Sequence, residues 1–177
     1  TLYLPEGAVT MLPALAIQKL GLGLQEKSAA LSFLIEVNHA GEIACKEIRP
    51  SWVRVTRISY ESVETKLDQQ PYQHLHQISL AYQDRRKRNG ALFIDLPEVN
   101  IRVNNGLVEI LPLARLESRT LVREAMLMAG EAAAQFAISE RLPFPFAIQE
   151  SPNAPYTVQG ENTVADLAGF FALRNKL

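Results

Sequence analysis

Residues 118–141 read SRTLVREAMLMAGEAAAQFAISER, a stretch rich in Ala, Leu and Met that favours one long helix. Four polar side chains interrupt it at helical spacing and fall on one narrow stripe: Thr120, Glu124, Glu131 and Gln135. Two interpretations stay open. The stripe is either the solvated edge of a core helix, or the face on which a buried helix presents carboxylates to a polar groove.

The composition sets limits on the class of protein. The chain has 177 residues, 47% of them hydrophobic, which is enough for the core of one domain. A formal net charge of −1 gives no overall basicity, although a local basic patch can still bind a polyanion. No apolar run reaches the roughly 18 residues that span a bilayer, so we expect no membrane partner. Because Thr1 stands where Met would be, we also expect a piece of a longer protein.

Metal ligands and nucleophiles are not grouped in the sequence. The aspartates are scattered, and His74 and His76 point to different sides of a predicted helix, so we expect structural histidines and no metal site. Cys45 has no neighbouring histidine and is expected to be a packed thiol. A single cysteine also fits a reducing compartment.

Turn and cap residues predict the elements of the first half of the chain. Ser59 is a good N-cap for a helix that begins at Tyr60, and Asn89-Gly90 is a good left-handed end for the helix before it. We expect the helix that begins at Tyr60 and the helix over residues 71–88 to form an antiparallel pair. The predicted elements are a helix over residues 12–20, a hairpin of strands 28–37 and 43–58 around the turn 38–41, a helix from residue 60, and a helix over 71–88.

The second half is predicted in the same way. Asn104-Asn105-Gly106 is a strong hairpin turn signal between two short strands. The expected elements are strands over 91–95, 100–103, 107–111 and 142–149, a loop over 150–160, and a terminal helix capped by Thr163. Together they predict a single α+β domain over residues 1–177, with a mixed antiparallel sheet packed by helices.

Two further features leave alternatives open. Residues 84–88 read Asp-Arg-Arg-Lys-Arg, which is either a solvated helix end that complements the helix dipole or a phosphate contact. Tyr3, Tyr60 and Phe93 are each able to stack on bases, but their spacing does not distinguish them from core aromatics.

Five short motifs, in order, cover nearly the whole chain. They are Tyr-Leu-Pro at 3–5 with Met-Leu-Pro at 11–13, Ile-Ser-Tyr-Glu at 58–61, Arg-Asn-Gly-Ala-Leu at 88–92, Pro-Glu at 97–98, and Ser-Arg at 118–119 followed by Leu-Val-Arg-Glu-Ala-Met at 121–126. This order resembles the interior of the catalytic domain of the ribonuclease II and ribonuclease R family, the RNB domain. Gly130, where the family more often has Asn, resembles cyanobacterial and plastid-like members. A location in the cytoplasm or the plastid stroma is the corresponding expectation.

The resemblance implies roles for four residues. Tyr3 and Tyr60 match tyrosines near the RNA 3′ end, and Glu124 matches a helix glutamate that contacts the terminal nucleotide. Phe93 is the nearest aromatic for clamping a terminal base, with Ile94 as the alternative at that position. Arg123 departs from the family, which usually has a second glutamate there.

The resemblance also implies a function. Family enzymes are 3′-to-5′ exoribonucleases that hydrolyse single-stranded RNA to nucleoside 5′-monophosphates with Mg²⁺. Their metal-binding aspartates precede the Tyr-Leu-Pro motif, and an arginine segment follows the region matched here. We therefore expect this chain to supply RNA-channel residues, to need flanking segments of the same domain, and to be inactive alone. The alternatives are a non-catalytic RNA-binding or scaffold protein of the same fold, and an unrelated α+β interaction module.

Overall fold

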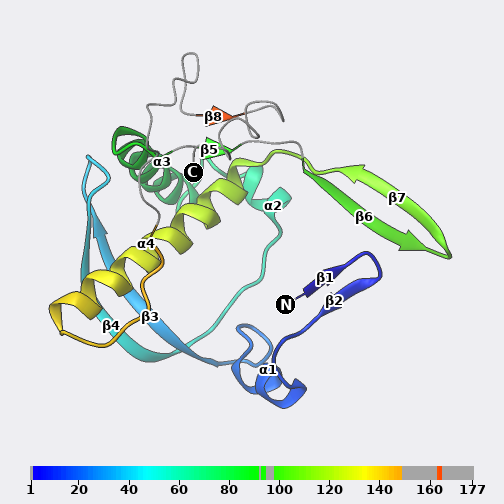
Figure 1. The fold of residues 1–177 in the computed structure, drawn as a ribbon, viewed down its shortest axis with the longest axis horizontal. Coiled ribbons are helices and arrows are strands. Elements are labelled where there is room, and N and C mark those ends of the chain that lie inside the picture. Colours follow the sequence, from blue (N-terminus) through cyan, green and yellow to red (C-terminus); the bar gives the residue numbers. More distant parts are fainter. Residues whose placement is uncertain (1, 92, 95–97, 149–162, 165–177) are drawn as a thin grey trace.

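A long antiparallel hairpin and a long helix pack against each other on one side of the molecule, at the left of Figure 1. The computed structural model describes residues 2–91, 93–94, 98–148 and 163–164. The hairpin pairs β3 (Ser28–Val37) with β4 (Ile43–Val53), and the helix is α4 (Glu117–Ser139). The hairpin and the helix over 118–141 are confirmed. The second strand is shorter than predicted, because β3 begins at Ser28 and offers no partner beyond Val53.

The turn of this hairpin is built by one asparagine. The side-chain Oδ1 of Asn38 accepts hydrogen bonds from the backbone nitrogens of Ala40 (3.0 Å) and Glu42 (2.9 Å). Gly41 takes a φ of +79°, which favours glycine. The turn therefore closes as the sequence predicts, and Figure 1 shows its tip beside α3 (Tyr72–Arg88).

Two helices, α2 (Tyr60–Glu64) and α3, pack along α4. Short α2 begins after Ser59, whose hydroxyl accepts a 3.2 Å hydrogen bond from the Ser62 nitrogen, so the predicted cap is confirmed. The Glu64 carboxylate accepts hydrogen bonds from the backbone nitrogens of Glu117 (3.1 Å) and Ser118 (2.9 Å). The expected pairing of α2 with α3 is corrected, since both pack on α4 instead.

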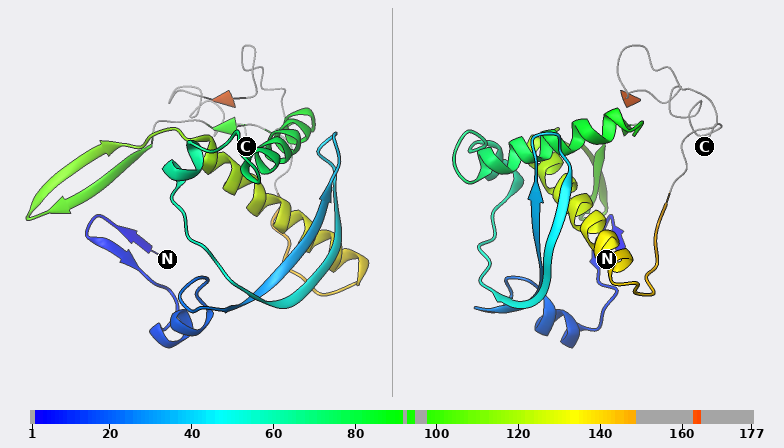
Figure 2. Two further views of the ribbon diagram at one scale, coloured as in Figure 1. Left: turned by 180° about the vertical axis from the view of Figure 1, so that it is seen from behind. Right: turned by 90° about the vertical axis from the view of Figure 1, so that its left-hand side faces the viewer.

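The core lies between α3, α4 and the β3–β4 hairpin, which Figure 2 shows from two further sides. Its buried members are Ile43, Tyr82, Met128 and Ala132. Gln135 fastens α4 to β4, because its amide contacts the Cys45 nitrogen and the Ile43 oxygen, each at 3.4 Å. Cys45 packs against this core, as expected of a structural thiol.

Two smaller hairpins project together on the side away from β3–β4 (Figures 1 and 2). One pairs β1 (Leu2–Leu4) with β2 (Gly7–Val9), and the other pairs β6 (Val99–Asn104) with β7 (Leu107–Pro112). Asn105 and Gly106 have positive φ angles of 50° and 79°, so the predicted turn is confirmed. Helix α1 (Ala14–Leu20) confirms the helix predicted over residues 12–20, but it begins two residues later, with Pro13 as its N-cap.

The last part of the chain differs from the prediction. Residues 142–148 contain no strand, because Pro143 and Pro145 remove two hydrogen-bond donors. Thr163 is not a helix cap but begins β8 (Thr163–Val164), which pairs in parallel with β5 (Phe93–Ile94). The loop over 150–160 and the helix expected after Thr163 lie outside the described residues. The α+β class is confirmed, with the described strands arranged in two-stranded pairs.

Candidate nucleic-acid interface

The carboxylate of Glu124 is completely buried and paired with two arginines. Its exposed fraction is 0%, and it accepts hydrogen bonds from Arg86 Nη1 (2.8 Å) and Arg123 Nε (3.1 Å). Each of the two carboxylate oxygens binds one of these arginines. Of the two interpretations of the polar stripe, the solvated edge is therefore wrong for Glu124, because the stripe faces α3 and the core.

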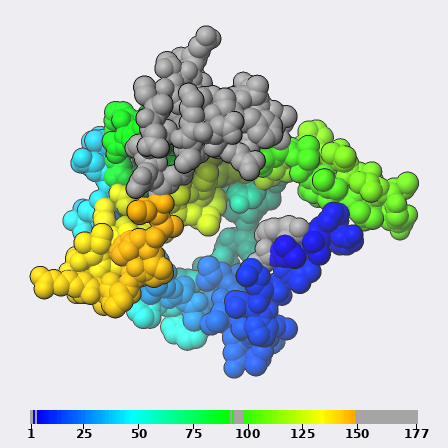
Figure 3. Space-filling view, in the orientation of Figure 1, coloured from blue at the N-terminus to red at the C-terminus, as the bar shows by residue number. Residues whose placement is uncertain are grey.

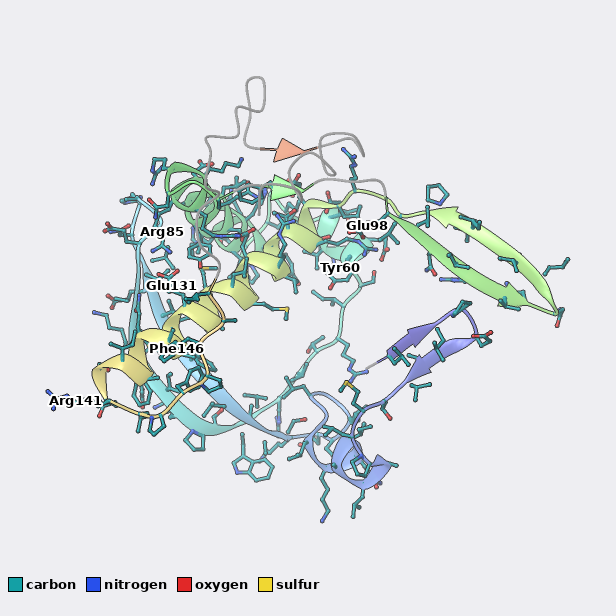
Figure 4. The ribbon with its side chains drawn as sticks, in the orientation of Figure 1. Tyr60, Arg85, Glu98, Glu131, Arg141 and Phe146 are labelled. Atoms are coloured by element: carbon teal, nitrogen blue, oxygen red, sulfur yellow. The ribbon has the colours of Figure 1, made fainter. Side chains whose placement is uncertain are left out.

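A second carboxylate repeats the arrangement two helical turns along α4. Glu131 accepts hydrogen bonds from Arg85, from Tyr82 Oη (2.8 Å) and from Gln135 Nε2 (3.4 Å). Figure 4 shows Arg85 and Glu131 between α3 and α4. We call the pairs Arg85–Glu131 and Arg86–Glu124 the arginine clamp. The basic run 84–88 is therefore not simply a solvated helix end, because two of its arginines bind carboxylates of α4.

Tyr82, which donates a hydrogen bond to Glu131 of the clamp, makes the stability of the folded chain depend on pH. Burial of its hydroxyl, together with the hydrogen bond to Glu131, raises the pKa of Tyr82 to about 12 from 10.0. Between these two values the folded chain keeps a proton that the unfolded chain loses, so the folded state loses stability as the pH rises.

We expect the free energy of unfolding to fall by on the order of 2 kcal/mol between pH 10 and pH 12 because of Tyr82 alone. The measurement is urea unfolding at several pH values, compared with Tyr82→Phe, which cannot titrate. An equal loss in both proteins would contradict the prediction.

Phe93 lies against the same cluster. The guanidinium of Arg86 is 5.3 Å from the centre of its ring, and Lys87 Nζ is 5.4 Å from it. Arg86 therefore contacts both Phe93 and Glu124. The structure brings these two predicted residues together through an arginine that the motif comparison did not single out.

Tyr60 lies beside the first turn of α4. It starts α2, is 40% exposed, and carries the guanidinium of Arg119 at 4.9 Å from its ring centre. Arg119 stands five residues before Glu124, about 7.5 Å along the helix axis. Tyr60, in α2, therefore lies beside the end of α4 that also carries Glu124. The backbone of Tyr3 pairs with Ala8 in β1, and its side chain lies outside what the structure describes.

An open cleft of about 940 Å³ lies between the two small hairpins, beside Arg119. A hydrogen bond of 3.3 Å from the Val103 nitrogen to the Pro5 oxygen joins its walls. Its lining includes the charged side chains Glu6, Glu98, Arg102 and Arg119. Figure 3 also shows an opening through the middle of the molecule, bordered in part by α4 and by the segment from β4 to α2.

The family model for the RNB domain matches residues 1–167. The chain belongs to the RNB family. Among curated relatives, this RNB chain is 36% identical over 165 residues to an uncharacterized ribonuclease of Synechocystis sp., covering 88% of the chain and 24% of the relative. It is 26% identical over 178 residues to ribonuclease R of Thermotoga maritima, covering 92% and 25%. The RNB chain thus spans about a quarter of the length of these relatives.

Solved structures show the same fold. Ribonuclease R of Mycoplasma genitalium, in its apo form, superposes on the RNB chain with a TM-score of 0.71 at 20% identity. The match covers 85% of the RNB chain and 26% of the solved chain. The same enzyme in complex with ribose-methylated single-stranded RNA gives the same TM-score. The recognition of the family from five motifs is confirmed.

The described part of the RNB chain does not fit a magnesium site. No three His, Cys, Asp or Glu side chains come together among the described residues. His76 Nε2 lies 3.8 Å from Glu117 Oε2. Across the same residues, no helix is long and apolar enough to cross a membrane.

The sequence did not show which side chains the arginines of this RNB chain bind. Arg85 and Arg86 were visible as part of a basic run, but their carboxylate partners lie on a helix far along the chain. Arg119 stands next to Ser118 in the family motif, yet its contact with Tyr60 joins two separate helices. Such contacts depend on how the helices pack, and a short stretch of sequence does not reveal that.

Proposed function

We propose that this chain is the interior part of the catalytic domain of a 3′-to-5′ exoribonuclease. The parent enzyme hydrolyses single-stranded RNA to nucleoside 5′-monophosphates, and this chain supplies residues of its RNA channel. The observation that carries the proposal is the RNB match over residues 1–167. The fold shared with ribonuclease R is consistent with it.

In this proposal the predicted residues bind the 3′ end of the RNA. Tyr3, Tyr60 and Phe93 offer aromatic faces to unstacked bases without regard to sequence. Glu124 accepts a hydrogen bond from a ribose hydroxyl of the terminal nucleotide. Arg123, whose side chain is 52% exposed, is the partner able to swing away and free Glu124 Oε1 for that bond.

Hydrolysis needs more than these side chains. Attack of water on a phosphodiester requires stabilisation of the negative charge that develops on phosphate oxygens. Neither the aromatics nor Glu124 provides it, and Mg²⁺ would supply that stabilisation in the parent enzyme. We place its ligands outside this chain, which is therefore inactive alone.

The test uses RNA labelled in its 3′-terminal nucleotide, incubated with magnesium. The full-length protein is expected to release the label as a nucleoside 5′-monophosphate, while this chain alone releases none. Mononucleotide release by this chain would contradict its proposed inactivity. Salt-sensitive RNA binding by the full-length protein without turnover would instead favour the non-catalytic RNA-binding alternative.

A further inference from the structure

Arg119 differs from the neighbouring arginines because its guanidinium has no hydrogen-bond or ion-pair partner among the described residues. Arg85, Arg86 and Arg123 bind carboxylates of α4, and Arg88 donates to the Ala40 oxygen at 2.7 Å. The guanidinium of Arg119 makes no hydrogen bond or ion pair with any residue that the structure describes, and its Nε is buried without a partner. Its two terminal Nη groups, which are not buried in this way, are therefore the donors available to a ligand.

Tyr60 holds this guanidinium in place. The 4.9 Å distance from the guanidinium carbon to the ring centre is that of a cation–π contact. Stacking fixes the plane of the guanidinium while leaving its edge, which carries the N–H groups, able to donate. An arginine stacked in this way is preorganised for an anion with several oxygens.

The surroundings of Arg119 favour a nucleotide. It lines the cleft between the two small hairpins, which holds a second cation, Arg102. Glu6 and Glu98 line the same cleft and can accept hydrogen bonds from hydroxyl and amino groups. Cations for phosphate and acceptors for ribose or base are thus present in one open space.

We propose that Arg119 binds a backbone phosphate of single-stranded RNA and that Tyr60 acts as its positioning residue. This deepens the proposed function and rests on it. Arg119 covers one face of the Tyr60 ring, so a base can stack only on the other face. The main contribution of Tyr60 is then to orient Arg119.

The experiment measures binding of a fluorescent oligoadenylate to the full-length protein in EDTA, over a series of salt concentrations. Arg119→Gln is expected to weaken binding about tenfold at 0.1 M salt, the size of a hydrogen bond to a charged group. The slope of log K against log salt becomes shallower by about 0.7, as for the loss of one phosphate contact with a single strand. Tyr60→Leu should give part of the same loss, whereas Tyr60→Phe keeps the ring and should bind normally.

Arg49→Gln is the matched control, because it removes an equal charge from an exposed site on β4. It is expected to change neither affinity nor slope. If Arg119→Gln matches Arg49→Gln while the wild type binds RNA, this inference is overturned and the proposed function stands. If the wild type binds no RNA at any salt concentration, both are overturned. Should Arg119→Gln unfold, Tyr60→Leu with normal affinity and slope overturns the inference in its place.

Discussion

Arg86→Met is expected to lower the free energy of unfolding by about 3 kcal/mol. The substitution leaves one oxygen of the fully buried Glu124 without its cation, and breaking a buried pair in this way costs about 3–5 kcal/mol. We place the effect at the low end because the Arg86 side chain is 27% exposed. Urea unfolding of the full-length protein measures it.

Arg123→Met is the matched control for this pair. Arg123 binds the other oxygen of the same carboxylate but is about half exposed, so its loss should cost less than about 1 kcal/mol. Adding Glu124→Met to Arg86→Met removes the unpaired charge and should recover most of the stability. Equal costs for the two arginines would show that burial of Glu124 does not control the effect.

Gly41→Ala is expected to destabilise the chain by about 3 kcal/mol through two effects. The φ of +79° strains any residue with a Cβ. A Cβ there would also lie 2.6 Å from the Ala81 carbonyl carbon and 2.9 Å from the Tyr82 nitrogen. Since both are backbone atoms of α3, they cannot rotate away.

Gly106→Ala separates these two effects. Gly106 has the same φ of +79°, but a Cβ there would meet nothing within 4 Å. Its substitution should therefore cost only the backbone strain, about 1–2 kcal/mol. Urea unfolding of both variants gives the cost of the close approach as their difference, and equal losses would contradict a tight contact between the turn and α3.

The elements predicted correctly are those with local causes. The β3–β4 turn depends on Asn38 and Gly41, the start of α2 on Ser59, and the β6–β7 turn on Asn105 and Gly106. In each case the residues that form the turn or cap stand next to the elements they connect. Such signals are complete within a few residues.

The errors involve partners that are distant in sequence. Periodicity placed Glu124 and Gln135 on one stripe of α4 correctly, but it could not show which face of the helix is buried. The polar stripe faces inward because α3 supplies arginines, while Met126 is 71% exposed. Pairing of β5 with β8 joins two segments that carry no mutual signal.

The candidate site was predicted in the same partial way. The resemblance selected Phe93 and Glu124, and the structure joins them through Arg86. It also selected Tyr60, but not Arg119, which contacts it. Their roles in RNA binding stay predictions for the experiments above.

The arginine clamp also fixes how far α3 can slide along α4. Arg85 and Arg86 are neighbours on α3, whereas Glu124 and Glu131 lie two turns apart on α4. A shift of one turn, about 5.4 Å, would bring the two arginines toward Thr120 and Met128. It would leave the buried carboxylate of Glu124 without this partner. An apolar contact of the same size would permit several such alignments. The two ion pairs therefore specify one helix register, and with it the position at which α4 presents Arg119.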